Sequence, residues 1–153
     1  MAIKRIKVQL DEGAFAPESA HETDAGYDLR TPTDLIVRAG GSVTVDTGVH
    51  IAIPEGFVGF LKSKSGLNVR DSLTGEGVID SGYTGSIVVK LYNHNPEDMF
   101  GEFFGGIVRD KFFKRGDKII QLVLLPIIKP DIVIVKRLEK SERGDKGFGS
   151  TGR

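Results

Sequence analysis

The sequence predicts an all-β domain, either a sandwich or a barrel, and three observations support this prediction. Apolar and polar residues alternate from Ser42 to Ile53, as in a strand with one buried face. The other apolar runs are short and rich in β-branched residues, and 20 Gly and 6 Pro punctuate the gaps between them. No window shows the 3.6-residue apolar period of a capped helix, so strands dominate the prediction.

The predicted strands follow one another along the whole chain. Val43, Val45, Thr47, Val49, Ile51 and Ile53 share the buried face of the strand that begins at Ser42, and Pro54 ends it. Alternation fails in 119–125, so we expect both faces of that strand to be covered, the second by another subunit. Besides the long strand at 42–53, strands are predicted at Ile6–Leu10, Leu35–Arg38, Phe57–Lys62, Ser86–Asn93, Ile119–Leu125 and Ile132–Leu138.

Composition excludes several classes of function. The formal net charge of +0 predicts no broad attraction to nucleic acid or to a membrane surface. With Cys at 0 there is no disulfide or thiolate metal site, and the 3 His are too scattered for a zinc site. The N-terminus lacks a secretion signal, and no apolar run reaches the length of a membrane span. A cytoplasmic location is therefore expected.

One domain is predicted for residues 1–141, and a different composition follows it. A long connection at about 95–115 carries five phenylalanines, and loops of this length are usually functional or ordered by a neighbour. Residues 142–153 contain one large apolar side chain, Phe148, in a glycine-rich setting, so this tail should be flexible.

Two early patches combine glycine with charged or hydroxyl residues. Ala25–Leu29 by itself reads as a turn, in which Gly26 takes a positive φ and Asp28 bonds local backbone. Lys62–Leu67 offers hydroxyls, backbone N–H groups and the Lys64 ammonium, which suits a phosphate cradle, although a simple polar turn explains it equally well. It is not a P-loop, and no helix is predicted to follow it.

Three later patches carry further candidates. In Gly75–Gly85, Asp80 suits a general base, and Tyr83 between glycines suits stacking on a base or sugar; a hairpin with an exposed tyrosine is the simpler alternative. Gln121 lies among apolar residues, where its amide needs partners for either structure or function. In the tail, Arg143 and Phe148 could reach a phosphate and cover a base, unless the tail is merely disordered.

The order and spacing of the five patches resemble the five motifs of the homotrimeric dUTPase family. In this chain they read AGYDL, KSKSGL, GEGVIDSGYTGSI, GDKIIQLVLLP and RGDKGFGSTG, and they run from Ala25 to Gly152. The resemblance implies a jelly-roll-like β-barrel or sandwich and a homotrimer with swapped C-terminal segments. It also implies hydrolysis of dUTP to dUMP and pyrophosphate by in-line attack of water on the α-phosphorus. This reaction keeps uracil out of DNA and supplies dUMP for thymidylate synthesis.

The resemblance also assigns roles to individual residues. Asp80 resembles the carboxylate that activates the water, and Gln121 the glutamine beside it. Tyr83 resembles the residue that packs under deoxyribose and excludes a 2′-hydroxyl. Mg²⁺ is expected mainly on the substrate phosphates, with Asp28 joined to it through water. The remaining residues resemble those that bind substrate: Lys64, Ser65 and Gly66 at the phosphates, Gly77, Val78, Ile79 and Val88 at uracil, and Arg143, Phe148, Gly149 and Ser150 in a C-terminal lid formed by 142–153.

Three departures from the family pattern leave alternatives open. Lys64 replaces the usual arginine, Thr74 replaces an asparagine of some relatives, and the connection at 95–115 is longer than usual. A dCTP deaminase on the same fold is one alternative, with Glu76 as its only nearby acid. A phage-type enzyme that also binds a regulatory protein through 95–115 is the other.

Overall fold

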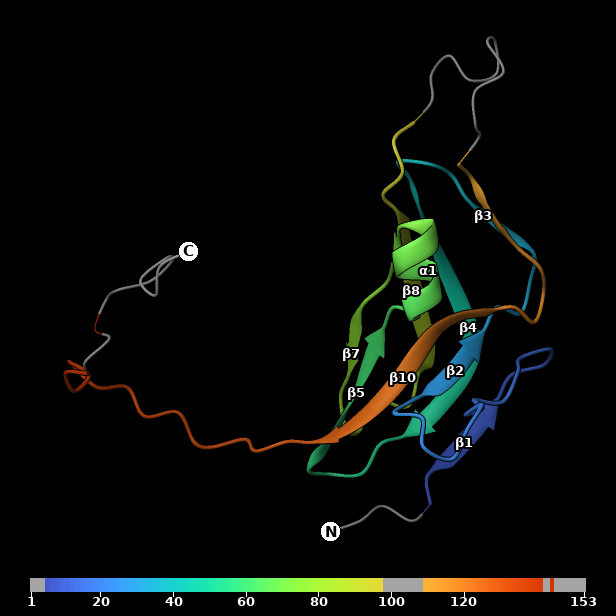
Figure 1. The fold of residues 1–153 in the computed structure, drawn as a ribbon. Coiled ribbons are helices and arrows are strands. Elements are labelled where there is room, and N and C mark those ends of the chain that lie inside the picture. Colours follow the sequence, from blue (N-terminus) through green and yellow to red (C-terminus); the bar gives the residue numbers. More distant parts are fainter. Residues whose placement is uncertain (1–4, 98–108, 142–143, 145–153) are drawn as a thin grey trace.

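The computed structural model describes residues 5–97, 109–141 and 144, and in them it confirms the all-β prediction. Two four-stranded sheets pack face to face, and a small third sheet lies at one end (Figure 1). Every strand pairing is antiparallel. The fold is the expected jelly-roll-like arrangement, with the core between the two larger sheets.

The first sheet has the order β1-β4-β8-β6 and the second the order β2-β10-β5-β7, while β3 and β9 form the third. β4 and β10 are the long central strands, and each pairs with two neighbours. The bounds are β1 Lys7–Leu10, β2 Tyr27–Arg30, β3 Leu35–Val37, β4 Ser42–Ala52, β5 Phe57–Lys62, α1 Ser65–Asp71, β6 Leu73–Thr74, β7 Gly77–Ile79, β8 Ser86–Asn93, β9 Lys111–Phe113 and β10 Lys118–Pro126.

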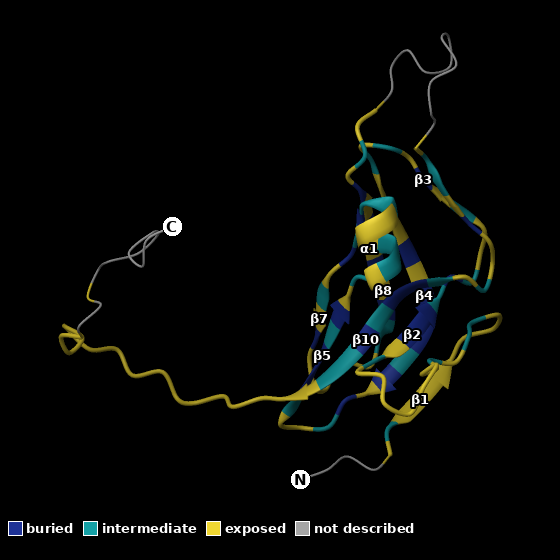
Figure 2. Cartoon of the chain, viewed as in Figure 1, coloured by how far each residue is buried: buried dark blue, intermediate teal, exposed yellow. Residues whose placement is uncertain are grey.

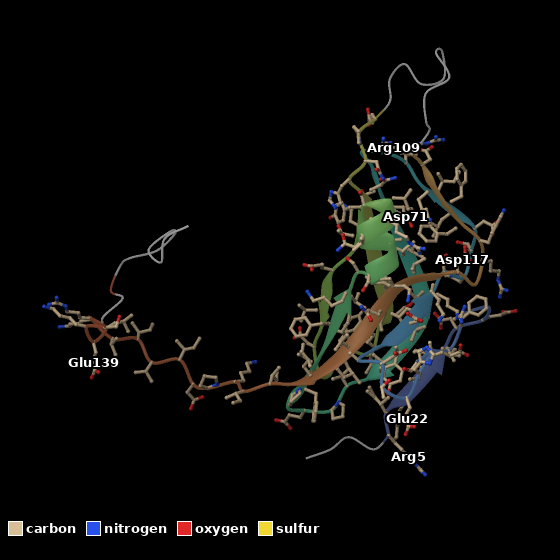
Figure 3. The ribbon with its side chains drawn as sticks, in the orientation of Figure 1. Arg5, Glu22, Asp71, Arg109, Asp117 and Glu139 are labelled. Atoms are coloured by element: carbon tan, nitrogen blue, oxygen red, sulfur yellow. The ribbon has the colours of Figure 1, made fainter. Side chains whose placement is uncertain are left out.

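The strand prediction is confirmed in the first six of its seven segments. The face of β4 predicted to be buried is the buried one, from Val45 through Thr47 to Ile51. Four strands were not predicted, namely β2, β6, β7 and β9, and each has four residues or fewer, which is too short for alternation to show. β9 lies inside the connection predicted at 95–115. Arg109, just before β9, lies at the same end of the molecule as Asp71 of α1 (Figure 3).

The strand predicted at Ile132–Leu138 is wrong. Residues 127–141 form an extended arm that leaves the sheets after β10 and contains no strand (Figure 1). The whole arm is exposed to solvent (Figure 2). This includes its apolar side chains, since Ile128 and Ile134 are each 94% exposed. The β-branched composition favours a strand, but a strand requires a partner, and none of the described residues supplies one.

β10 shows why alternation failed in its first half. The pairing with β2 shifts between Lys118 and Ile120, which is the signature of a β-bulge. Because of the bulge, Ile119 and Ile120 are both buried, at 1% and 0% exposure. Two consecutive isoleucines therefore enter one core.

The described residues contain one helix, α1, and no helix among them is long and apolar enough to cross a membrane.

Candidate active site

Three of the five patches meet at one pocket of about 350 Å³. The start of β2, the turn into α1 and the start of β10 converge there because β10 lies between β2 and β5 in the second sheet. The residues that line the pocket are Ala20, Asp24, Ala25, Gly26, Asp28, Lys64, Ser65, Gly66, Lys118 and Gln121. The structure thus brings together Asp28, Lys64, Ser65, Gly66 and Gln121, which the sequence analysis had singled out separately.

A buried carboxylate organises the charges of this pocket. Asp28 is 8% exposed and forms ion pairs with Lys64 through Oδ1 and with Lys118 through Oδ2, the latter at 2.7 Å. Burial by itself would raise the pKa of Asp28, but the hydrogen bonds from Lys118 and Lys64 outweigh it and hold the pKa below its usual range. The trio keeps a formal charge of +1, and such a preorganised cationic group suits phosphate oxygens.

Lys118 was missed by the sequence analysis, and the bulge in β10 explains why. In a regular strand, residues three apart face opposite sides, so Lys118 and Gln121 would not share a face. The register shift between Lys118 and Ile120 turns both toward the pocket. The available signal was the pair of adjacent isoleucines between them, which breaks alternation at that point.

The first two patches differ locally from what was expected. Gly26 does not have a positive φ; instead, a Cβ at this position would lie 2.8 Å from the carbonyl oxygen of Leu122. The patch is therefore the strand β2 pressed against β10 rather than a turn. The prediction that no helix follows Lys62–Leu67 is also wrong, since α1 begins at Ser65 with Lys64 as its N-cap. The first N–H groups of that turn have no partner within the helix.

Gln121 connects the pocket to the third patch. Its Nε2 donates to the carbonyl oxygen of Ser63 at 3.3 Å. The hydroxyl of Ser63 in turn accepts from the N–H of Gly75 at 3.0 Å and donates to the carbonyl oxygen of Gly75 at 3.2 Å. The Gln121 amide nitrogen therefore has a structural partner, and the residue lines the pocket.

Asp80 and Tyr83 lie on a separate, exposed turn between β7 and β8. Asp80 is exposed, and the N–H of Tyr83 donates to its carbonyl oxygen at 3.2 Å. The Tyr83 hydroxyl donates to the carbonyl oxygen of Ser86 at 2.9 Å, so the ring folds back over Gly85. A Cβ at Gly85 would meet the Tyr83 hydroxyl at 2.5 Å, which is why only glycine fits beneath the ring.

The strands that flank this turn do not form a paired hairpin. β7 is the edge strand of one sheet, and β8 belongs to the other, where β6 pairs with it only at Tyr92 and Asn93. Gly77–Ile79 pairs only with β5, and β8 near Val88 only with β4, so the other backbone edge of each segment has no strand partner among the described residues. Val78 is 59% exposed on this side. An open edge of this kind can exchange hydrogen bonds with a planar polar ligand.

One chain does not bring the exposed turn to the cationic pocket. Gln121 pairs with Lys62, whereas Ile79, just before Asp80, pairs with Gly59 on the same strand. This offset of three residues separates the two groups by about 10 Å along the sheet, in addition to the strands between them. Neither Asp80 nor Tyr83 lines the pocket of Asp28. Arg143, Phe148, Gly149 and Ser150 lie outside the described residues.

Comparison with known proteins gives one consistent result. The family model described as dUTPase matches residues 13–152. A deoxyuridine 5'-triphosphate nucleotidohydrolase of Eremothecium gossypii is 39% identical over 96% of this chain and 90% of the relative. The protein of the same name from Paramecium bursaria Chlorella virus 1 is 40% identical over 94% of each chain.

Solved structures agree with the sequence relatives. A mutant dUTPase of Staphylococcus bacteriophage 80alpha with dUpNHpp superposes with a TM-score of 0.87 at 30% identity, over 99% of this chain and 100% of that one. A mutant dUTPase of phage phi11 of S. aureus, described as revealing the coordination of a structural Mg(II) ion, has a TM-score of 0.78 at 29% identity, over 89% and 99%.

Proposed function

From the premise that the chain belongs to the dUTPase family and hydrolyses dUTP to dUMP and pyrophosphate, we propose that its active site is composite. The turn of Asp80 and Tyr83 from one copy would face the cationic pocket of another. The observation that carries this proposal is the separation of the two groups within one chain, each of which holds only part of the required chemistry.

The pocket is proposed to hold the triphosphate. Lys64 and Lys118 are held at fixed positions by Asp28, and the N–H groups of Ser65 and Gly66 add donors at the pocket wall. Lysine offers a point charge rather than a planar fork, and two lysines on one carboxylate would supply a second positive charge where the family resemblance implies an arginine. Gln121 is placed to orient the attacking water beside these phosphates.

The exposed turn is proposed to hold the nucleoside and activate the water. Asp80 is the general base, worth about 10²–10⁴-fold in rate. The open edges of Gly77–Ile79 and Val88 would read uracil through backbone donors and acceptors, so that cytosine would leave buried polar groups unpaired. The Tyr83 ring, backed by Gly85, would pack under deoxyribose and leave no space for a 2′-hydroxyl.

Mg²⁺ enters this proposal as part of the substrate. Among the described residues, no three His, Cys, Asp or Glu side chains gather as a metal cage, and both oxygens of Asp28 are paired with lysines. This donor set fits a triphosphate that carries its own ion, and Asp24 and Asp28, which line the pocket, would accept hydrogen bonds from the ion's water shell. When bound, the ion neutralises charge on the phosphates.

The exposed arm supports a homotrimer with swapped C-terminal segments. Its isoleucines are bare in the single chain, and the edge strand β1, exposed along its length, is one place where an added strand could pair. The tail 142–153 would then reach a site of a neighbouring copy and close it, which excludes water from the reaction. Deleting residues 142–153 should lower kcat sharply, and an unchanged kcat would remove the lid from the mechanism.

Subunit mixing tests the composite site directly. When present in all copies, Asp80→Asn should abolish turnover and Lys64→Ala should lower kcat/KM sharply, so activity is measured at a dUTP concentration far below the KM of Lys64→Ala. If each site takes Asp80 and Lys64 from different copies, random 1:1 mixing restores about a quarter of the sites. If both groups act within one chain, every mixed assembly stays inactive. Equal amounts of each variant mixed with itself provide the matched control.

The deaminase alternative gains no support. The curated relatives are named nucleotidohydrolases, and the Glu76 carboxylate is paired with Lys62 at 3.0 Å on the surface. An added regulatory role has one observation in its favour: dUTPases of bacteriophage 80alpha are described as controlling transfer of virulence genes. We propose residues 95–115 as the corresponding protein-binding segment. Replacing 98–108 by a short Gly-Ser linker should then abolish partner binding while dUTP turnover continues.

A further inference from the structure

β4 carries a bulge beside the base of the Tyr83 turn. Its pairing with β8 moves from Asp46 opposite Val88 to His50 opposite Ser86, so β4 has extra residues in this interval. Gly48, within the bulge, has a φ of +66°, a value that favours glycine. The bulge therefore places side chains of β4 against the first residues of β8, directly after the turn.

Three polar residues of this bulge, Asp46, Thr47 and His50, contact the turn or the first residues of β8. The Thr47 hydroxyl donates to the carbonyl oxygen of Ile87 at 2.8 Å. Asp46 accepts from the Ser86 hydroxyl and, at 3.0 Å, from the N–H of Gly48. These contacts hold Ser86 and Ile87, and the carbonyl oxygen of Ser86 in turn accepts the hydrogen bond from the Tyr83 hydroxyl.

His50 supplies the outermost contact. Its Nδ1 lies 2.8 Å from the carbonyl oxygen of Thr84, and its Nε2 lies 3.2 Å from Oδ1 of Asp11. Both partners can only accept hydrogen bonds. Both ring nitrogens must therefore carry a proton for the two bonds to exist together, and only the imidazolium satisfies this arrangement. The neutral ring has only one N–H, and because a carboxylate is the stronger acceptor, it keeps the bond to Asp11 and releases the Thr84 carbonyl.

The surrounding charges favour that cation. The hydrogen bond to the Thr84 carbonyl, followed by the one to Asp11, raises the pKa of His50 above its ordinary value, and the charges of Asp11 and Asp46 add to this while burial opposes it. Lys7, which lines the same small pocket, is the nearby cationic side chain. The side chain of His50 is 23% exposed, so it exchanges protons readily with solvent.

We propose that His50, held by Asp11, is a positioning residue that fixes the Thr84 carbonyl and thereby the Tyr83 ring that selects deoxyribose. The inference rests on the function proposed above for Tyr83. Discrimination against UTP is then strongest while the ring is protonated, and it weakens as pH rises and the imidazolium is lost.

Two substitutions separate the two bonds. The amide nitrogen of asparagine occupies about the place of Nδ1, so His50→Asn keeps a pH-independent donor to Thr84. The amide nitrogen of glutamine occupies about the place of Nε2, so His50→Gln keeps only the bond to Asp11. The measurement is the ratio of kcat/KM for dUTP to that for UTP across about pH 6–9. Ionisations that both substrates share cancel in this ratio.

In the wild type we expect the ratio to fall about three- to tenfold as pH rises, the scale of one lost charge-assisted hydrogen bond in a partly exposed site. His50→Asn should keep the low-pH ratio at all pH values, and His50→Gln should show the reduced ratio throughout. A wild-type ratio that does not change with pH, or a His50→Gln enzyme as selective as the wild type, overturns the proposal. Thermal unfolding midpoints check that all variants are folded at the assay temperature.

A second measurement separates this inference from the proposed role of Tyr83. In the protein without nucleotide, NMR titration of the His50 ring nitrogens and of the Thr84 carbonyl carbon should give one common pKa. If the Thr84 signal does not change as His50 titrates, the proposed link from His50 to the Thr84 carbonyl (the tether) is refuted, whatever selectivity the kinetics show. If the two signals titrate together but Tyr83→Ala retains full selectivity for dUTP over UTP, the tether stands and the steric role of Tyr83 is wrong.

Discussion

The cationic pocket and the Tyr83 turn are built by opposite means. In the pocket, a buried carboxylate holds two lysines, and three elements distant in sequence converge on it. In the turn, Asp80 is exposed, and side chains of the β4 bulge hydrogen-bond to Thr84 and to the residues that follow it. The pocket is thus preorganised by charge, and the turn by hydrogen bonds to the Thr84 carbonyl and to the first residues of β8.

This difference matches what each region is proposed to bind. A triphosphate is highly charged, and fixed cations recognise it without reorganising when it arrives. A nucleoside has little charge, and shape and backbone hydrogen bonds must distinguish it from close analogues. Substitutions in the pocket should therefore mainly change affinity for the phosphates, whereas substitutions in the turn should change chemistry and selectivity.

The largest expected effect sharpens this comparison at Asp80. Asp80→Asn preserves the shape of the side chain but removes the base, so kcat should fall about 10²–10⁴-fold while the Kd for a non-hydrolysable dUTP analogue stays within about threefold. Single-turnover kinetics and isothermal titration calorimetry measure the two quantities. An Asp80→Asn enzyme with wild-type turnover would place the base elsewhere.

A smaller effect is expected at Lys118 in the pocket. Lys118→Met keeps the length of the side chain and removes its charge, so KM for dUTP should rise about tenfold, the worth of one charge-assisted hydrogen bond, with a smaller change in kcat. Lys114→Met is the matched control, because Lys114 pairs with Asp34 at 3.2 Å on an exposed surface outside the pocket. Equal KM values for the two variants would contradict the assignment of Lys118 to phosphate binding.

The smallest expected effect concerns stability at acid pH. The pKa of Asp28 in the folded protein lies below the ordinary value of 3.8. Its ion pairs therefore contribute stability that is present above pH 3.8 and is lost as pH falls through the lowered pKa. Urea unfolding should show a shallower loss of stability below that pH in Asp28→Asn than in the wild type. Parallel curves would indicate that the carboxylate ionises equally in both states.

The sequence by itself determined much of this protein. The alternation over Ser42–Ile53 predicted the buried face of β4 because side chains of a strand alternate between two faces whatever the neighbours are. The five ordered patches identified the family because each depends on particular side chains and glycines at fixed positions. Local composition was sufficient for the longer strands that met a regular partner, but not for the short strands β6, β7 and β9, which are also regularly paired.

Only the tertiary structure decided the features that depend on pairing. The bulge in β10 put Lys118 beside Gln121, and the bulge in β4 put His50 against Thr84. The segment 132–138 has the composition of a strand but lacks a partner among the described residues, so it remains an extended arm. Register shifts and strand partners are properties of two segments at once, and a local pattern in one segment cannot specify them.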